Sequence, residues 1–173
     1  MVFILGMCAL IGEIYVVGER QEQQNRTNAK LNAMTYAGHI YGELMEGIGV
    51  TDTLKQVVIS GNGNINKFYD VAANMMDDSI QSIQIAPNGV VNEIYPEDVN
   101  ESGKIDLIND SDRGEISRYA RDNDTVIMQG PFELKQGGYG IAVRNPVYLE
   151  DENGKKSFWG FTIVILKVPE IFS

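Results

Sequence analysis

Hydrophobic residues in the first third of the chain recur at helical spacing. Residues 2–17 are almost continuously apolar and are followed by the polar segment 19–25. From residue 21 to 49 there is no proline, and apolar or small residues lie three and four positions apart. This stripe consists of Leu31, Met34, Gly38, Tyr41, Met45 and Ile48. The spacing predicts a long amphipathic helix whose stripe is either a coiled-coil seam with a second copy or a face that covers a sheet.

Shorter helices are predicted at three further places. A short helix is expected at 54–59, because glycines and asparagines at 61–64 end the pattern. A second helix is expected at 65–77, where apolar residues again follow helical spacing. Asp112 and Glu115 resemble a capping box, which predicts a third helix from there. Its buried side would consist of Ile116, Tyr119 and Ala120.

Beyond residue 78 the hydrophobic period changes from helical to two, which is typical of strands. Asn88-Gly89 lies between two such runs and predicts a hairpin with a type I′ turn, since both residues tolerate positive φ. Strands are expected at 82–85, 90–95, 125–129, 139–148 and 158–166. Together with the helices, they predict an α+β domain with a long N-terminal helix and an antiparallel sheet of about five strands.

Composition narrows the function classes. The 173 residues are 43% hydrophobic and suffice for one ordinary domain. A net charge of -10 argues against binding to nucleic acid. A single cysteine, Cys8, and a single histidine, His39, exclude an intrachain disulfide, a multi-cysteine zinc site and a histidine-based metal site. No phosphate-binding glycine loop and no acid/base pair stands out, so we expect neither a cofactor nor an enzyme activity of this fragment.

The apolar start of the chain has two interpretations. Residues 1–18 are too short for a complete membrane span, lack a preceding basic residue and contain Glu13. They are either the outer end of a transmembrane helix or the start of an apolar helix that packs on its own domain or on a second copy.

A loop at 98–109 resembles a calcium-binding loop. Asp98, Asn100, Ser102 and Asp106 offer oxygen ligands at the expected positions, with Gly103 at the sixth. However, Asn109 stands where a bidentate glutamate is expected, and no helix precedes the loop. Calcium binding and a plain polar connection between strand and helix are both left open.

The strand around 141–148 carries an arginine on an inner face. Alternation places Ala142, Arg144 and Tyr148 on one face, and Ile141, Val143 and Val147 on the other. An arginine on an inner face needs an anion or acceptors. We therefore expect Arg144 to form an internal salt bridge, to bind a ligand carboxylate or phosphate, or to be simply exposed.

Several short motifs, in this order, resemble the CHASE extracellular sensor domain over residues 30–168. They are 85–91 (IAPNGVV), Tyr95-Pro96, Asp106-Leu107, Arg113, 130–134 (GPFEL), 136–138 (QGG), 144–148 (RNPVY) and 158–161 (FWGF). The resemblance implies a PAS-like sheet and a position outside the cell, between two transmembrane helices, in bacterial receptors of the histidine kinase or diguanylate cyclase type. Residues 19–168 would then be the sensor domain, 1–18 the end of the first membrane helix and 169–173 the start of the link to the second.

The resemblance also implies a ligand site. By motif position, the residues that contact cytokinin in plant CHASE domains correspond to Asp106, Gln129, Lys135 and Arg144, and Tyr148 shares the strand face of Arg144. Because Lys135 and Arg144 replace uncharged residues of those relatives, a small anionic or zwitterionic ligand suits this chain better than a cytokinin. The alternative function is a ligand-free dimerisation module that uses the stripe of the long helix.

Overall fold

The computed structural model describes residues 2–97, 103, 105–134 and 137–168, with side chains from residue 15 onward. The chain divides into two compact units, Met1–Gly42 and Glu43–Ser173. Helix α1 (Val2–Ser60) supplies all described residues of the first unit and continues into the second. No helix within the described part of the chain is long and apolar enough to span a membrane.

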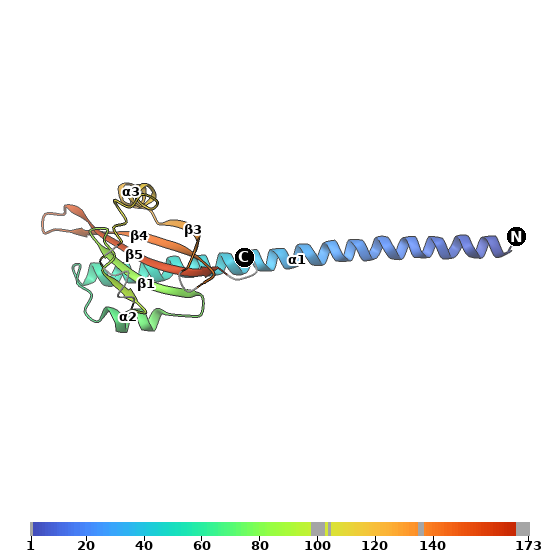
Figure 1. Cartoon of the computed structure of the whole chain (residues 1–173), viewed down its shortest axis with the longest axis horizontal. Coiled ribbons are helices and arrows are strands. Elements are labelled where there is room, and N and C mark those ends of the chain that lie inside the picture. Colours follow the sequence, from blue (N-terminus) through green and yellow to red (C-terminus); the bar gives the residue numbers. More distant parts are fainter. Residues whose placement is uncertain (1, 98–102, 104, 135–136, 169–173) are drawn as a thin grey trace. The chain divides into compact units, whose positions relative to one another are not determined.

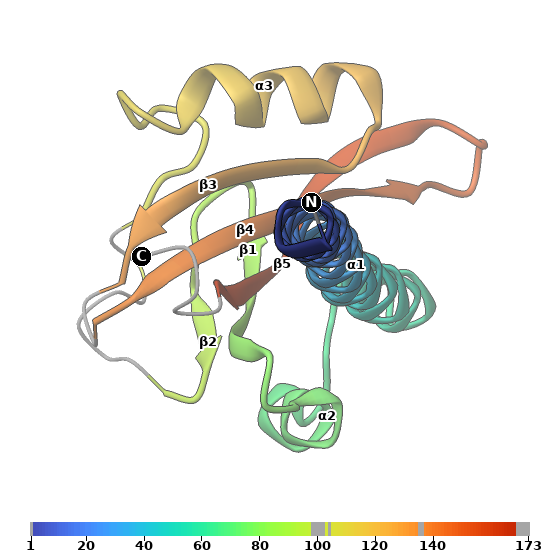
Figure 2. The ribbon, with the colours of Figure 1, turned by 90° about the vertical axis from the view of Figure 1, so that its right-hand side faces the viewer.

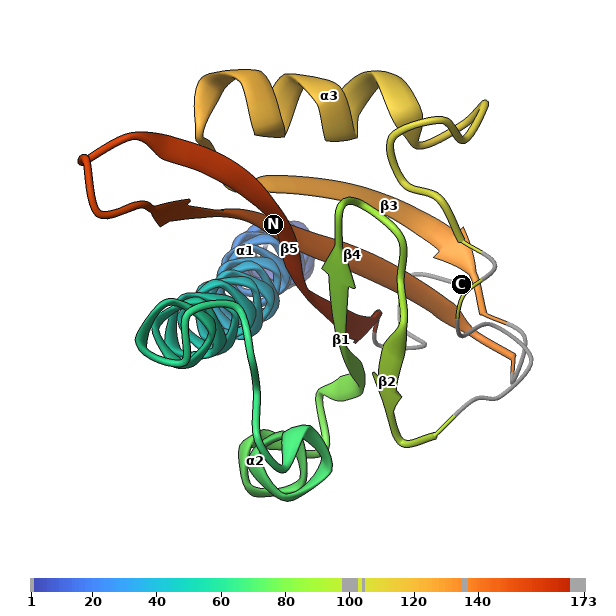
Figure 3. The same cartoon turned by 90° about the vertical axis from the view of Figure 1, so that its left-hand side faces the viewer.

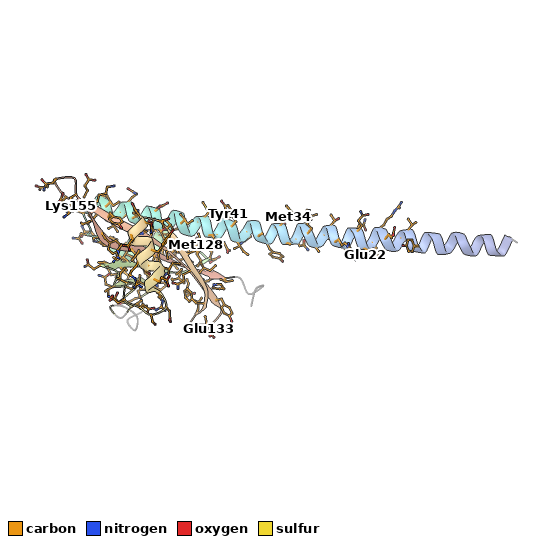
Figure 4. All side chains as sticks on the ribbon, turned by 90° about the horizontal axis from the view of Figure 1, so that it is seen from above. Glu22, Met34, Tyr41, Met128, Glu133 and Lys155 are labelled. Atoms are coloured by element: carbon orange, nitrogen blue, oxygen red, sulfur yellow. The ribbon has the colours of Figure 1, made fainter. Side chains whose placement is uncertain are left out.

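The part of α1 in the first unit is solvent-exposed. Leu31, Met34 and Tyr41 are 56%, 62% and 66% exposed, and the last two are labelled along the helix in Figure 4. The coiled-coil seam that these residues predict therefore stays a prediction.

The part of α1 in the second unit packs on the sheet with a face that includes only part of the predicted stripe. Of the stripe residues, Ile48 packs against the core but Met45 is 47% exposed. Leu44, outside the stripe, also packs against the core, and Leu54 is fully buried. The separate helix predicted at 54–59 is also wrong, because α1 runs without a break to Ser60. Burial of this face outweighs the low helix propensity of the glycines that precede it.

The sheet confirms the predicted α+β fold, with its long N-terminal helix, PAS-like antiparallel sheet and short flanking helices. Its five strands are β1 (Ile80–Pro87), β2 (Glu93–Tyr95), β3 (Ile127–Glu133), β4 (Tyr139–Glu150) and β5 (Lys156–Val168), in the order β2-β1-β5-β4-β3. Every neighbouring pair is antiparallel, and β4 and β5 form the longest ladder (Figure 1).

Helices cover the two faces of this sheet unequally. Helix α2 (Phe68–Met75) and the end of α1 lie on one face, and α3 (Gly114–Asn123) lies on the other, over β3 and β4 (Figures 2 and 3). One hydrophobic cluster therefore forms on each side. The cluster under α1 and α2 includes Leu54, Phe68, Ile83, Val143 and Val164. The cluster on the α3 side includes Val91, Leu107, Ala120, Phe161 and Ile163.

The predicted type I′ turn is confirmed. Asn88 and Gly89 have φ of 55° and 86°, and the Val90 amide donates to the Pro87 carbonyl over 3.1 Å. The second strand is shorter than predicted, however, because the chain after the turn pairs elsewhere. The Val91 amide donates to Ile105 over 3.0 Å, which holds the segment before Leu107 beside the sheet.

The predicted capping box at Asp112 is wrong. Arg113 is the residue before the first turn of α3 and makes no side-chain cap. Instead, the Asp110 carboxylate accepts hydrogen bonds from the backbone amides of Asp112 and Arg113, both over 2.9 Å. An earlier aspartate thus satisfies the free amides ahead of the helix. Tyr119, expected on the buried side, is 59% exposed.

Candidate ligand-binding site

A cavity of about 330 Å³ lies on the α3 side of the sheet, within the second unit. Its apolar lining includes Val91, Ile94, Leu107, Phe132, Ile163 and Ile165. Its polar lining includes Ser82, Gln84, Glu97, Arg113, Glu133 and Arg144. Polar and apolar groups thus share the lining in similar proportion, and a cavity of this volume can hold a small molecule.

Strand register sets the floor of this cavity. Gln84 pairs with Ile163, and Ile163 pairs with Arg144 on the next strand. Since neighbouring strands are about 4.8 Å apart, the backbones at Gln84 and Arg144 are separated by roughly 10 Å, with Ile163 between them. The floor thus carries one polar side chain on each side of an apolar centre.

Arg144 is a buried cation with incomplete hydrogen bonding. Arg144 is only 3% exposed, and its Nη1 donates a hydrogen bond to Gln129 Oε1 over 2.6 Å. Its Nε has no hydrogen-bond partner among the described residues, and none of them forms a salt bridge with it. Simple exposure is therefore wrong for Arg144, and no described residue forms the internal salt bridge with it. Ligand binding by Arg144 stays a prediction.

Burial also lowers the pKa of Arg144. Desolvation, reinforced by repulsion from Arg113 and only partly offset by Asp110, lowers the pKa of its guanidinium to about 10. At neutral pH the group is still charged. A charge held away from water without a carboxylate is unfavourable, and an anion in the cavity would relieve that cost.

Two neighbours position the cation side of the cavity. Gln129, which contacts Arg144, donates from its Nε2 to the Asp112 carbonyl over 3.0 Å. Arg113 forms a salt bridge with Asp110 over 2.9 Å, so its charge is already compensated. Arg144 is consequently the lining cation that lacks an anionic partner among the described residues.

Sequence reasoning missed the polar residues of β1. Ser82 and Gln84 are 9% and 7% exposed, and Gln84 Nε2 donates to Ser82 Oγ over 3.0 Å. Their alternation with Ile83 and Ile85 predicted a strand but assigned no role to its polar face. The missed signal was that a polar pair on one face also suits the floor of a polar cavity.

Sequence reasoning also missed the acidic residues of the lining. Glu97 and Glu133 line the cavity and are exposed to solvent, and neither forms a salt bridge with a described residue. Figure 4 labels Glu133 at the end of β3, at the edge of the domain. Their carboxylates therefore belong to the open side of the cavity.

The other predicted site residues lie elsewhere. The Asp106 carboxylate accepts hydrogen bonds from the Ile108 and Asn109 amides over 3.0 and 3.1 Å. The hydrogen bond from the Asn109 side chain, together with these two, lowers the pKa of Asp106. The Tyr148 hydroxyl donates to the Arg121 carbonyl and thereby joins β4 to α3. Neither residue lines the cavity. Their roles as ligand contacts stay predictions, and Lys135 lies outside the described residues.

The calcium hypothesis for 98–109 falls largely on residues that the structure does not describe. Residues 98–102 and 104 are among them. Of the expected ligands, Asp106 uses both carboxylate oxygens in the hydrogen bonds of its own turn, with Asn109 Nδ2 donating to Oδ2 over 2.7 Å. The hypothesis stays a prediction.

On the opposite face of the same strands, polar side chains form hydrogen bonds to α1. Asn145 donates from Nδ2 to Asp52 over 2.6 Å and accepts from Lys55 over 3.2 Å. Thr162 on β5 donates to the Thr51 carbonyl of α1 over 3.0 Å. The network fixes the last turns of α1 to β4 and β5, directly behind Arg144.

Comparisons with known proteins support the fold. No protein-family model matches the chain, and no curated protein matches its sequence, so the CHASE resemblance stays a prediction. Among solved structures, an extracellular ligand binding receptor from Desulfohalobium retbaense DSM5692 is similar, with a TM-score of 0.59 and 12% identity. The match covers 79% of this chain and 24% of that chain, so it spans about a quarter of the receptor. The chain thus shares the fold of one part of an extracellular receptor.

Proposed function

We propose that the chain is the ligand-binding sensor domain of a membrane receptor, located outside the cytoplasm, that binds a small molecule through an anionic group. In this proposal the domain binds without catalysing a reaction. Residues 1–18 and 169–173 lead to the membrane. The output domain is of the histidine kinase or diguanylate cyclase type that the CHASE resemblance implies.

The observation that carries the proposal is the Arg144 guanidinium in the cavity. A buried arginine that lacks an anionic partner lowers stability, and such a group is retained where a ligand completes its bonding. The fold shared with part of an extracellular ligand binding receptor supports the same function. The apolar remainder of the lining suits a small organic molecule rather than a hydrated inorganic ion.

A thermal-shift screen of the chain tests the proposal. The panel contains organic acids, amino acids, purines and calcium chloride, each at millimolar concentration. We expect a saturable rise in the melting temperature with at least one anionic or zwitterionic compound, because a ligand that binds only the folded state stabilises it.

Two variants locate the binding. Arg144→Met should abolish the rise, whereas Arg26→Met, the same change at an exposed arginine of α1, should retain it. A flat screen, or a rise that survives Arg144→Met, would overturn the proposal. A rise with calcium alone would instead favour the loop at 98–109.

The exposed stripe of α1 supports dimerisation as a second candidate function. Leu31, Met34 and Tyr41 are separated by three and seven positions, which places them on one side of the helix, and each is more than half exposed. Sedimentation analysis should show a monomer–dimer equilibrium that Leu31→Glu with Tyr41→Glu abolishes. A dimer that no compound of the panel stabilises would favour this function over sensing.

A further inference from the structure

Charges along the cavity are separated by depth. Among the described residues, four charged side chains line it, namely Glu97, Arg113, Glu133 and Arg144. Arg113 is compensated by Asp110 at 2.9 Å. This leaves one buried cation, Arg144, and two exposed carboxylates without a salt bridge to a described residue.

This arrangement discriminates between classes of charged ligand. A ligand with only a negative charge would form an ion pair with Arg144. It would also be repelled by the two carboxylates, in a chain whose net charge is -10. A dianion would have one buried cation for two charges. A plain cation would place its charge near Arg144 or leave the arginine unpartnered. Each of these ligands leaves a charge of the cavity uncompensated.

We propose that the ligand is a zwitterion with an apolar side chain, in the class of free aliphatic amino acids. This inference rests on the function proposed above and narrows its ligand class. The carboxylate binds Arg144 and takes up the bonding capacity of Nε, and the ammonium group lies toward Glu97 and Glu133. The hydrocarbon side chain packs on the apolar lining, which includes Leu107, Phe132 and Ile163.

Three matched probes separate the contributions of the two charged groups. Leucine carries both groups, 4-methylpentanoate lacks the ammonium and 3-methylbutylamine lacks the carboxylate, while the hydrocarbon is nearly the same. Glutamate serves as the probe with a second carboxylate. Isothermal titration of the whole chain with each compound should give measurable binding for leucine and at least tenfold weaker binding for the other three.

A double variant tests the acidic side of the cavity. Glu97→Gln with Glu133→Gln should weaken leucine binding by about fivefold, as expected for partly exposed charge pairs, and should strengthen 4-methylpentanoate binding. Glu150→Gln with Glu152→Gln is the matched control, since it removes the same charge at exposed positions next to the β4–β5 turn. The control should leave both affinities unchanged.

The outcomes distinguish this inference from the proposed function. Preferred binding of 4-methylpentanoate, glutamate or another acid, lost in Arg144→Met, would overturn the inference and leave the proposed function intact. Unchanged leucine affinity in the Glu97/Glu133 double variant would overturn the inference alone as well. Failure of every probe and of the wider panel to bind would overturn both.

Discussion

Adjacent residues of β4 face two different environments. Arg144 lies on the cavity side and Asn145 on the side of α1, and they are 3% and 2% exposed. Asn145 has a partner at each end of its amide, Asp52 and Lys55, whereas Arg144 has Gln129 at one nitrogen and, among the described residues, none at Nε. Equal burial thus goes with complete hydrogen bonding on the helix side of this strand and with incomplete hydrogen bonding on the cavity side. The proposed ligand would complete the latter.

The largest effect is expected for Arg144→Met. Ligand affinity should fall by about a hundredfold or more, because a buried charge-assisted contact is lost. The free energy of unfolding of the ligand-free domain should rise by about 1–3 kcal/mol at pH 7, since burial lowers the pKa of Arg144 and so disfavours its charged form in the folded state. Urea denaturation and titration calorimetry measure the two changes. A variant that loses stability instead would show that Arg144 supports the fold.

Asn145→Ala should have the opposite profile. It removes two hydrogen bonds to charged groups and leaves a small void, so the free energy of unfolding should fall by about 2 kcal/mol. Ligand affinity, measured well below the melting temperature, should stay within about twofold. Asn153→Ala in the exposed β4–β5 turn is the control. A large loss of affinity with normal stability would contradict the division between the two faces.

Gln129→Glu would give Arg144 an internal carboxylate, which none of the described residues supplies. Arg144 Nη1 already lies 2.6 Å from the Gln129 oxygen, so a short ion pair should form there. We expect about tenfold weaker binding of a ligand carboxylate, together with a gain of about 1 kcal/mol in the free energy of unfolding. Thermal shift with and without ligand gives both values. Unchanged affinity would indicate that the ligand does not use this guanidinium.

The smallest effect is expected for Asp106→Ala. The carboxylate organises its own turn, so its loss should lower the free energy of unfolding by about 1 kcal/mol at pH 7 and leave ligand affinity unchanged. Because hydrogen bonds lower the pKa of Asp106 below 3.8, its contribution is present above that pH and is lost as the pH falls through the folded-state value. Denaturation at pH 7 and pH 3 measures this. Lost affinity with unchanged stability would favour the ligand contact that the CHASE resemblance implies.

Local pattern was enough to predict most elements. A period of two located the strands, a three-four period located α1, and the positive-φ tolerance of Asn88-Gly89 predicted its turn. The pattern did not reveal that Asp110, rather than Asp112, satisfies the amides before α3, because neighbouring aspartates compete for the same groups. It also predicted only part of the buried face of α1, Ile48 but not Leu44, since which side of a helix is buried depends on the sheet it meets.

Backbone periodicity is enough to predict the α+β class and to place Arg144 on an inner strand face. Gln84 and Arg144, in contrast, reach one cavity floor through the register of β1, β5 and β4, which no local pattern predicts. The same holds for the salt bridge that compensates Arg113 and for Arg144, which has no anionic partner among the described residues. The physical reason is that periodicity acts over a few residues, whereas the partners of a buried charge come from segments that meet only on folding.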